Sequence, residues 1–302
     1  KTADKIALNL GLSSNGPERI EAGILHTQQE AEDEGHTHME RREIALQAST
    51  LLETQADEVE NRIQSLLVNG ELVTTNPDWL QLPSSWKAEE NIAKALKAIL
   101  KTQSSLPSIL IDKAIDWAQN KAGFKFADGQ SEGIQNSLSS KVAILTGGPG
   151  TGKTTILRAI VSILKAKKTK VLLAAPTGRA ARRMAESASH FAQTVHRLLK
   201  FDPSHGGFTV NERSPLVCDF LIMDETSMLD IRLAAALFRS VPAHAHILLV
   251  GDADQLPSVG SGNVLKDLID CDLFSVTRLQ VTFRQAENSG IVELAHGILS
   301  GK

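Results

Sequence analysis

A glycine-rich segment that ends in Lys153 and Thr154 carries the clearest chemical signal in the sequence. It has the spacing G-x-x-x-x-G-K-T and consists of Gly147, Gly148, Pro149, Gly150, Thr151, Gly152, Lys153 and Thr154. Backbone N–H groups of such a turn, followed by a helix N-terminus, surround a phosphate group. The Lys153 ammonium would neutralise the β- and γ-phosphates of a nucleotide, and the Thr154 hydroxyl would bind Mg²⁺. We therefore predict a nucleotide site, which also includes Thr155 at the start of the next helix.

An acidic pair, Asp224 and Glu225, follows a short apolar run further along the chain. Asp224 could hold Mg²⁺ through water, and Glu225 could polarise the attacking water as a general base. By itself such a pair could also cap a helix. Together with the phosphate-binding loop, it predicts hydrolysis of a nucleoside triphosphate.

A third polar group, Gln255, lies in the segment 250–257 after another apolar run. Its neutral amide could form a hydrogen bond with either the γ-phosphate or the attacking water. The alternative is a simple Gly-Asp turn with no ligand. We include Gln255 among the candidate catalytic residues, with Glu225 and Lys153.

These three segments each follow a short apolar run that predicts a buried strand. Such runs separated by helix-length segments are typical of a parallel sheet that is buried on both faces. The four runs cover residues 142–145, 171–175, 220–223 and 247–250. We therefore predict an α/β domain over residues 123–302, with a parallel sheet flanked by helices.

The first 122 residues predict a separate and mostly helical domain. Apolar periodicity predicts helices over 17–31, 39–52 and 56–67, and a Thr37–Glu40 capping box would start the second helix. The turn at Asn69-Gly70 separates them from two short β-prone runs, 71–75 and 80–82. Three helices and a small hairpin suggest a winged helix. A helical packing domain that does not contact DNA is the other interpretation.

The whole-chain composition limits the possible partners and compartments. The net charge is −3 over 302 residues, so contact with nucleic acid would depend on local clusters. The two cysteines are far apart, no apolar run approaches ~18 residues and no signal-peptide pattern is present. We expect a cytoplasmic protein without a membrane partner. Because Lys1 is the first residue and no tail follows Lys302, we interpret the chain as a fragment.

Five segments together resemble successive motifs of the RecD and TraA group of superfamily 1 helicases. They are residues 175–181, 194–199, 224–228, 251–258 and 283–285. Residues 1–7 and 35–37 are similar to markers in RecD-like proteins that have a long N-terminal region. The resemblance implies a RecA-like ATPase domain that uses Mg²⁺ and ATP. It also implies 5′-to-3′ movement on single-stranded DNA by a longer protein with two motor domains.

The resemblance assigns further residues to the nucleotide. Gln130 resembles the Gln that reads the adenine edge, and its amide could bond both N6 and N7 of adenine. Arg284 resembles an arginine that reaches the γ-phosphate and would be a fourth catalytic residue. A surface glutamine and a structural arginine are the alternatives.

The resemblance also assigns a DNA-facing set, where backbone phosphate contacts would allow movement without reading sequence. This set comprises Pro176, Thr177, Gly178, Arg179, Thr194 and His196. Arg182 and Arg183 would add charge, or form a solvated helix face. The stretch 200–215 predicts a protruding hairpin, which the resemblance implies is a strand-separating pin; a surface loop is the alternative.

Other functions remain possible at this point. The partners could be recombination or repair proteins, and the chain could be the ATPase subunit of a recombination nuclease. A P-loop ATPase that serves assembly is a further alternative. A switch GTPase would carry Asn-Lys-x-Asp, which the sequence lacks. We also see no arginine-rich lid of the kind that a small-molecule kinase needs.

Overall fold

The computed structural model describes residues 9, 11, 16–76, 78–204 and 206–281. The chain forms two compact units, one of residues 1–90 with 259–262 and one of 91–258 with 263–302. The division lies within α5 (Pro83–Lys101) rather than at the predicted 122/123 boundary. The reason is that α6 (Ile111–Ala122) packs against α7 (Asp128–Ser139) and α8 (Lys153–Ala166) of the second unit.

Between residues 16 and 82, the described part of the first unit forms three helices and a small antiparallel sheet. The helices are α2 (Pro17–Asp33), α3 (Arg41–Leu52) and α4 (Ala56–Val68), and the strands are β1 (His38–Glu40), β2 (Val73–Asn76) and β3 (Trp79–Gln81). The sheet has the order β1-β3-β2. Fully buried Ile24, Ile44 and Ile63 form its core with Leu80. Along the chain these elements follow the order α2, β1, α3, α4, β2 and β3, and the winged-helix assignment stays a prediction.

The predicted start of the second helix is wrong by two residues. His38, Met39 and Glu40 form a strand instead, in which Met39 pairs with Leu80, and the helix begins at Arg41. The Thr37 hydroxyl lies 3.1 Å from Nδ1 of His38 and does not cap the helix. Pairing with β3 buries the Met39 side chain, and this tertiary gain outweighs the local capping signal.

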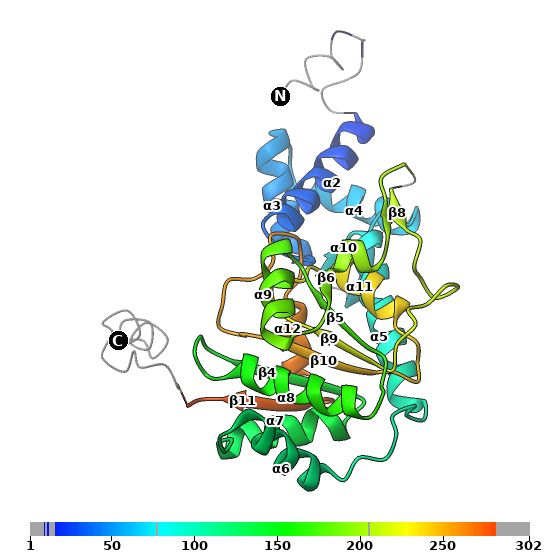
Figure 1. Ribbon diagram of the computed structural model, residues 1–302. Helices are drawn as coiled ribbons and strands as arrows, with labels where there is room; N and C mark the ends of the chain where they lie inside the picture. Colours follow the sequence, from blue (N-terminus) through cyan, green and yellow to red (C-terminus); the bar gives the residue numbers. More distant parts are fainter. Residues whose placement is uncertain (1–8, 10, 12–15, 77, 205, 282–302) are drawn as a thin grey trace. The chain divides into compact units, whose positions relative to one another are not determined.

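The second unit is built on a six-stranded parallel sheet (Figure 1) with the order β11-β4-β10-β9-β5-β6. The four predicted strands are present as β4 (Val142–Gly147), β5 (Val171–Ala175), β9 (Phe220–Met223) and β10 (His246–Gly251). The predicted α/β fold is therefore confirmed. The edge strands β6 (Ala192–Thr194) and β11 (Ser275–Leu279) were not predicted, because their short segments lack a continuous apolar run.

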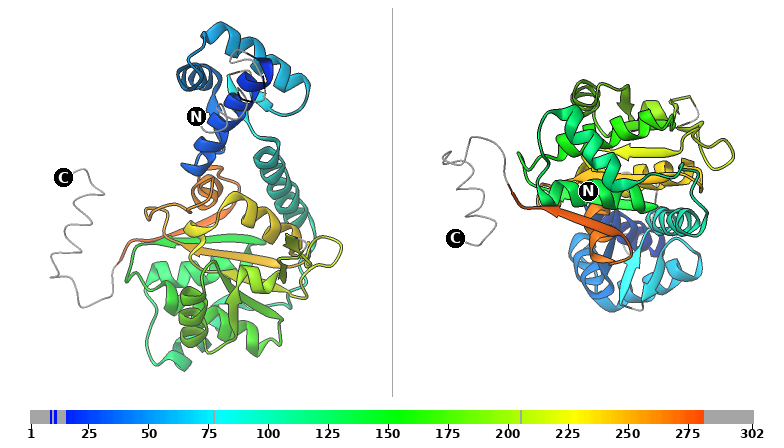
Figure 2. Two further views of the ribbon diagram at one scale, coloured as in Figure 1. Left: turned by 90° about the horizontal axis from the view of Figure 1, so that it is seen from above. Right: turned by 60° about the horizontal axis from the view of Figure 1, so that its bottom comes forward.

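Helices cover both faces of this sheet. Figures 1 and 2 show α8 and α9 (Gly178–Ala188) on one face, and α11 (Ile231–Ser240) with α12 (Val264–Asp270) on the other. Helix α8 follows β4 and buries seven side chains, among them Ile156 and Ile160, so it is apolar on most sides. This burial fixes the helix N-terminus at the end of β4, where the phosphate-binding loop lies.

Shorter elements lie between the motifs. They are α10 (Val195–Leu198), the paired strands β7 (Phe201–Asp202) and β8 (Gly207–Phe208), and the 3-10 helix η1 (Thr226–Met228). Phe201 pairs with Phe208 in the antiparallel β7–β8 pair, within the stretch where a hairpin was predicted. Within the described part of the chain, no helix is both long and apolar enough to span a membrane.

Candidate nucleotide-binding site

The phosphate-binding loop connects β4 to α8 in the conformation that its glycines permit. Gly150 and Gly152 have φ values of 83° and 89°, a region in which residues with a Cβ are strained. The Thr151 hydroxyl donates to the Gly148 carbonyl at 2.8 Å and closes the turn. The Lys153 ammonium donates to the Gly147 carbonyl and, at 3.0 Å, to the Gly148 carbonyl. The ammonium thus lies within the loop, where the phosphate oxygens of a nucleotide would bind.

A cavity of about 900 Å³ brings the loop together with the acidic pair. Among the residues that line it are Gly148, Pro149, Gly150, Thr151, Gly152, Lys153, Thr154, Thr155, Asp224, Glu225 and Gln255. The parallel sheet causes this convergence, because β4, β9 and β10 are neighbours and their carboxyl ends meet at one edge. Arg183, which extends from α9, also lines the cavity.

Burial perturbs the ionisation of the two central groups in opposite directions. It lowers the pKa of Lys153, against the raising effect of Asp252, Asp224 and Glu225. It raises the pKa of Asp224, and the Lys153 and Arg183 cations only partly offset this. A buried carboxylate of this kind gains from a nearby divalent cation. Asp224 and the Thr154 hydroxyl, both oxygen donors on one cavity, therefore fit Mg²⁺ held with phosphate oxygens.

Glu225 has an unusual backbone conformation, with φ at 52° and ψ at 43°. This left-handed conformation is uncommon for residues other than glycine, and in native structures such residues cluster at active sites. The Glu225 N–H donates to Oδ1 of Asp224 at 2.9 Å. The Thr226 hydroxyl lies 3.0 Å from the Val250 carbonyl, so the end of β9 is joined to the end of β10. These contacts fix the carboxylate of Glu225 beside the cavity.

Gln255 reaches the same cavity from the loop after β10. Its Nε2 donates to Oδ2 of Asp252 at 3.1 Å, and the Ala253 N–H donates to the Thr146 hydroxyl at the same distance. These bonds orient the loop against β4. Gln255 lines a cavity that also contains two carboxylates and an ammonium group, those of Asp224, Glu225 and Lys153. It can therefore respond to a γ-phosphate without adding charge.

A second cavity, of about 290 Å³, adjoins the first at Thr154 and Thr155. Phe124, Phe126 and Arg158 are among its lining residues, and the two phenyl rings meet edge-on at 5.6 Å. These lining residues were not predicted from the sequence. Two phenylalanines close together in a chain with 4% aromatic residues were a usable signal. The Phe126 N–H donates to Oε1 of Gln119 at 2.9 Å, which holds the segment in place.

Gln130 lies in α7, only 5% exposed. Its Oε1 accepts a hydrogen bond from the Ala127 N–H at 3.2 Å, so this carbonyl caps its own helix. Gln130 is not among the residues that line these two cavities. The adenine-reading role expected from the resemblance therefore stays a prediction.

The expected DNA-facing residues lie at the carboxyl ends of two paired strands. Pro176, Thr177, Gly178 and Arg179 follow β5, and Thr194 ends β6, where it pairs with Ala175. The hydroxyls of Thr177 and Thr194 accept hydrogen bonds from Ala180 N–H and Arg197 N–H, at 3.2 and 3.3 Å, and so cap α9 and α10. A cap hydroxyl keeps its own proton to donate to a phosphate.

His196 is exposed and contacts the β7–β8 pair. Its ring centroid lies 5.8 Å from that of Phe201 and 5.7 Å from that of Phe208, and the two phenyl rings lie 5.3 Å apart. His196 therefore joins the DNA-facing set to the hairpin rather than to the core. Arg284 lies outside the described residues, so its expected place near the γ-phosphate stays a prediction.

The parallel sheet, the phosphate-binding loop and the acidic pair define a P-loop nucleotide-binding domain of the RecA-like kind. A family model described as "AAA domain" matches residues 130–261. Another, described as "ATP-dependent RecD2 DNA helicase HHH domain", matches residues 1–38. Together with the relatives described next, these matches show that the chain is similar to RecD-like helicases over its whole length.

Two curated relatives share much of the sequence. The chain is 33% identical over its whole length to the ATP-dependent RecD2 DNA helicase of Deinococcus radiodurans, of which it covers 43%. It is 35% identical to the RecBCD enzyme subunit RecD of Mycobacterium tuberculosis, over 63% of this chain and 36% of the relative. A crystal structure of Pif1 helicase from Candida albicans is 23% identical over 57% of this chain and 44% of that chain, with a TM-score of 0.45. The chain spans less than half the length of these relatives.

Proposed function

We propose that the protein is an ATP-driven motor that moves 5′-to-3′ along single-stranded DNA and unwinds duplex DNA. The observation that carries this proposal is the single cavity that combines Lys153 and Thr154 with the acidic pair. The DNA-facing residues at the ends of β5 and β6 lie in the same sheet. Loss or gain of a γ-phosphate at one strand end can therefore change the position of residues at the neighbouring strand ends. The direction of movement is implied by the family resemblance.

Each residue of the cavity has a distinct role in this proposal. Lys153 and the N–H groups of the loop bind the β- and γ-phosphates, and Thr154 and Asp224 hold Mg²⁺, which supplies charge neutralisation when bound. Glu225 accepts a proton from the attacking water, because its carboxylate lies at the cavity edge. Gln255 senses the γ-phosphate through its amide. Arg284 would stabilise the charge that develops during phosphoryl transfer.

The second cavity is the proposed place of the nucleobase. It adjoins the phosphate-binding loop at Thr154 and Thr155, which line both cavities. The Phe124 ring and the Arg158 guanidinium offer stacking surfaces that any base can use. Gln130 would then add adenine preference only after its carbonyl leaves the Ala127 N–H.

We further propose that the β7–β8 hairpin separates the DNA strands. Phe201 is 44% exposed and forms a ring cluster with Phe208 and His196, next to the DNA-facing residues. An exposed aromatic surface can stack on the first unpaired base as the motor draws one strand past it.

Membership in a recombination nuclease is a second candidate, because relatives include a RecBCD enzyme subunit. The relative named RecD2 helicase aligns with the whole chain, including the N-terminal unit, and this favours a helicase that works alone. We also propose that the protein acts in the cytoplasm and that it contacts recombination or repair proteins.

The decisive experiment measures ATP hydrolysis by the full-length protein with and without single-stranded DNA. We expect strong stimulation by DNA, and its loss in Lys153→Ala. That variant should also bind Mg²⁺–ATP about ten- to a hundredfold more weakly in calorimetry, because one charge-assisted bond contributes ~1.5–3 kcal/mol. Lys97→Ala, an exposed lysine on α5, is the control. Hydrolysis without DNA stimulation in the wild type would instead indicate an assembly ATPase.

A further inference from the structure

The β7–β8 hairpin is too small to be rigid by itself. Each strand has two residues, and two residue pairs, Phe201–Phe208 and Asp202–Gly207, form the ladder. Two backbone bonds, from the N–H groups of Thr209 and Val210 to the carbonyls of Lys200 and Leu199 at 3.3 and 3.2 Å, continue it to the hairpin root. Isolated two-stranded hairpins are marginally stable even when longer. A hairpin that resists an incoming duplex therefore needs support at its root, on elements of the sheet unit.

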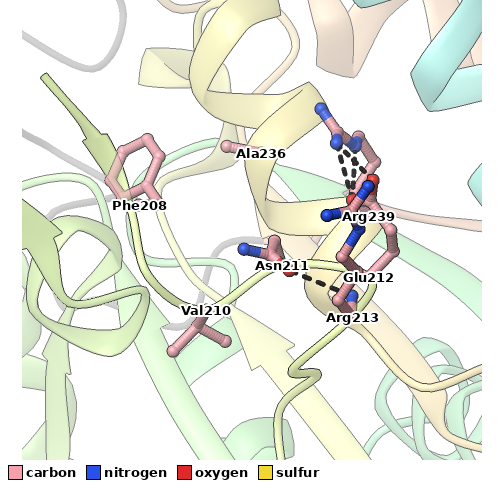
Figure 3. A pocket seen from close by; sticks show the side chains of 7 residues that line it. All are labelled: Phe208, Val210, Asn211, Glu212, Arg213, Ala236 and Arg239. Carbon is pink, nitrogen blue, oxygen red and sulfur yellow. Dashed lines mark hydrogen bonds and ion pairs between the residues drawn. The ribbon is translucent and has the colours of Figure 1, made fainter. Parts of the chain in front are cut away.

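On one side, the ring of His196 supplies that support. On the other side lies a cavity of about 360 Å³, which Phe208, Val210 and Ala236 help to line (Figure 3). An open cavity means that apolar packing between the hairpin root and α11 is incomplete there. Polar contacts supplement the packing of buried Val210 at this place.

Four residues make these contacts, and we call them the hairpin anchor: Val210, Glu212, Arg239 and Ser240. Arg239 donates from Nε and Nη2 to the two carboxylate oxygens of Glu212, at 2.9 and 2.6 Å (Figure 3). Such paired bonds fix direction as well as distance. The Ser240 hydroxyl, which is fully buried, lies 3.0 Å from the Val210 carbonyl.

The chain also returns to the same point after the hairpin. The Leu216 N–H donates to the Ser240 carbonyl at 2.8 Å, while Asn211 and Ser214 bond each other through their backbones at 3.2 and 3.1 Å. The segment 210–216 thus forms a closed loop whose two ends both lie on Ser240. Only Glu212 reaches from this loop to a cation on α11.

The position of α11 gives the anchor a role beyond stability. This helix begins at Ile231, shortly after Asp224 and Glu225, and ends at Ser240. Its 10 residues span about 15 Å. One rigid helix therefore connects the loop behind the acidic pair to the root of the hairpin.

We propose that Arg239 and Glu212 are positioning residues for strand separation: they fix the hairpin root to the end of α11, so that the hairpin keeps its place while the motor pulls. This inference rests on the proposed motor function. It adds a residue pair that neither touches the nucleotide cavity nor belongs to the DNA-facing set.

The test uses the full-length protein and compares unwinding of a 5′-tailed duplex with DNA-stimulated ATP hydrolysis. Arg239→Ala and Glu212→Ala should lower the unwinding rate about three- to tenfold, and leave hydrolysis within about twofold, because the pair is half-exposed and other contacts persist. The exchanged variant, Glu212→Arg with Arg239→Glu, should restore much of the unwinding. Arg41→Ala, which removes the ion pair with Glu60 in the first unit, is the matched control and should unwind normally.

Each other outcome has a defined meaning. Unchanged unwinding in both single variants overturns the anchor, and so does an equal loss of unwinding and hydrolysis that the exchange fails to restore. Replacement of residues 202–209 by a Gly-Ser linker tests the hairpin itself. If this variant unwinds DNA at the wild-type rate, neither the hairpin nor the hairpin anchor has a role in strand separation. Absence of DNA-stimulated hydrolysis in the wild type would reject the motor function instead.

Discussion

Gly147, at the start of the phosphate-binding loop, has no room for a side chain. A Cβ atom there would lie 2.7 Å from the Leu279 carbonyl oxygen and 2.9 Å from the Leu279 Cβ, both on β11. The neighbouring Gly148 has open space around the same position. Close approach of two strands, rather than a special φ, therefore requires glycine at Gly147.

We expect Gly147→Ala to destabilise the protein by about 1–3 kcal/mol, because the backbone of β11 would have to move. Gly148→Ala should change stability by less than about 0.5 kcal/mol, since nothing opposes its methyl group. Urea unfolding of the two variants checks this. Equal stability of both would show that β11 does not lie against the loop as described.

Substitution of Phe124 tests whether the nucleobase binds in the second cavity. Stacking of one base on an aromatic side chain contributes ~1–3 kcal/mol. We therefore expect Phe124→Ala to weaken Mg²⁺–ATP binding about five- to a hundredfold, and to leave binding of inorganic tripolyphosphate unchanged. Calorimetry with both ligands separates base from phosphate contacts. A variant that loses both equally would place Phe124 in support of the loop rather than beside the base.

At the scale of elements, a buried histidine secures the start of β10, at the opposite sheet edge from the nucleotide. His246 is 3% exposed and its ring stacks on Phe220 with a centroid separation of 5.8 Å. Nδ1 donates to the Ser140 carbonyl at 2.8 Å, so Nε2 is the unprotonated nitrogen that accepts from the Ser104 hydroxyl at 2.7 Å. Burial lowers the pKa of His246 to about 4.

This depressed pKa predicts a loss of stability in acid. The folded state favours the neutral His246 ring. The contribution of this ring to the free energy of unfolding is therefore complete above the unfolded pKa of about 6.5. It is lost progressively as pH falls from there to about 4, by roughly 2–3 kcal/mol at most. Urea unfolding at several pH values should show this slope in the wild type, and a smaller slope in His246→Asn. Exposed His26 gives the control variant, which should keep the wild-type slope.

At the scale of the whole molecule, the charge distribution limits DNA binding. The net charge is −3, and the positive groups near the expected DNA track are few, chiefly Arg179, Arg182 and Arg183 on α9. Arg182 is partly engaged by Glu186 at 3.0 Å. These three arginines can therefore neutralise only a small number of phosphates.

We expect single-strand binding by this chain to depend only weakly on salt. Each phosphate contact on a single strand contributes about −0.7 to the slope of log K against log salt. Fluorescence titrations at several salt concentrations should give a slope no steeper than about −5, and Arg179→Ala should reduce it by roughly 0.7. A much steeper slope would reveal a cationic surface outside α9.

The sequence by itself determined the phosphate-binding loop, the four inner strands and the acidic pair. These signals are local: G-x-x-x-x-G-K-T requires its own backbone turn, and a short apolar run such as Phe220–Met223 is typical of a strand buried between helices. The structure brings the ends of these segments together, since Lys153, Asp224 and Gln255 line one cavity.

Only the tertiary structure decided the rest, because the relevant contacts join residues far apart in the chain. The strand at Met39 exists because Leu80 pairs with it, against a local helix signal. The assignment of α6 to the sheet unit follows from its packing on α8 rather than from its own periodicity. Likewise, the Arg239–Glu212 pair depends on how the end of α11 meets the hairpin root, and neither residue carries a motif of its own.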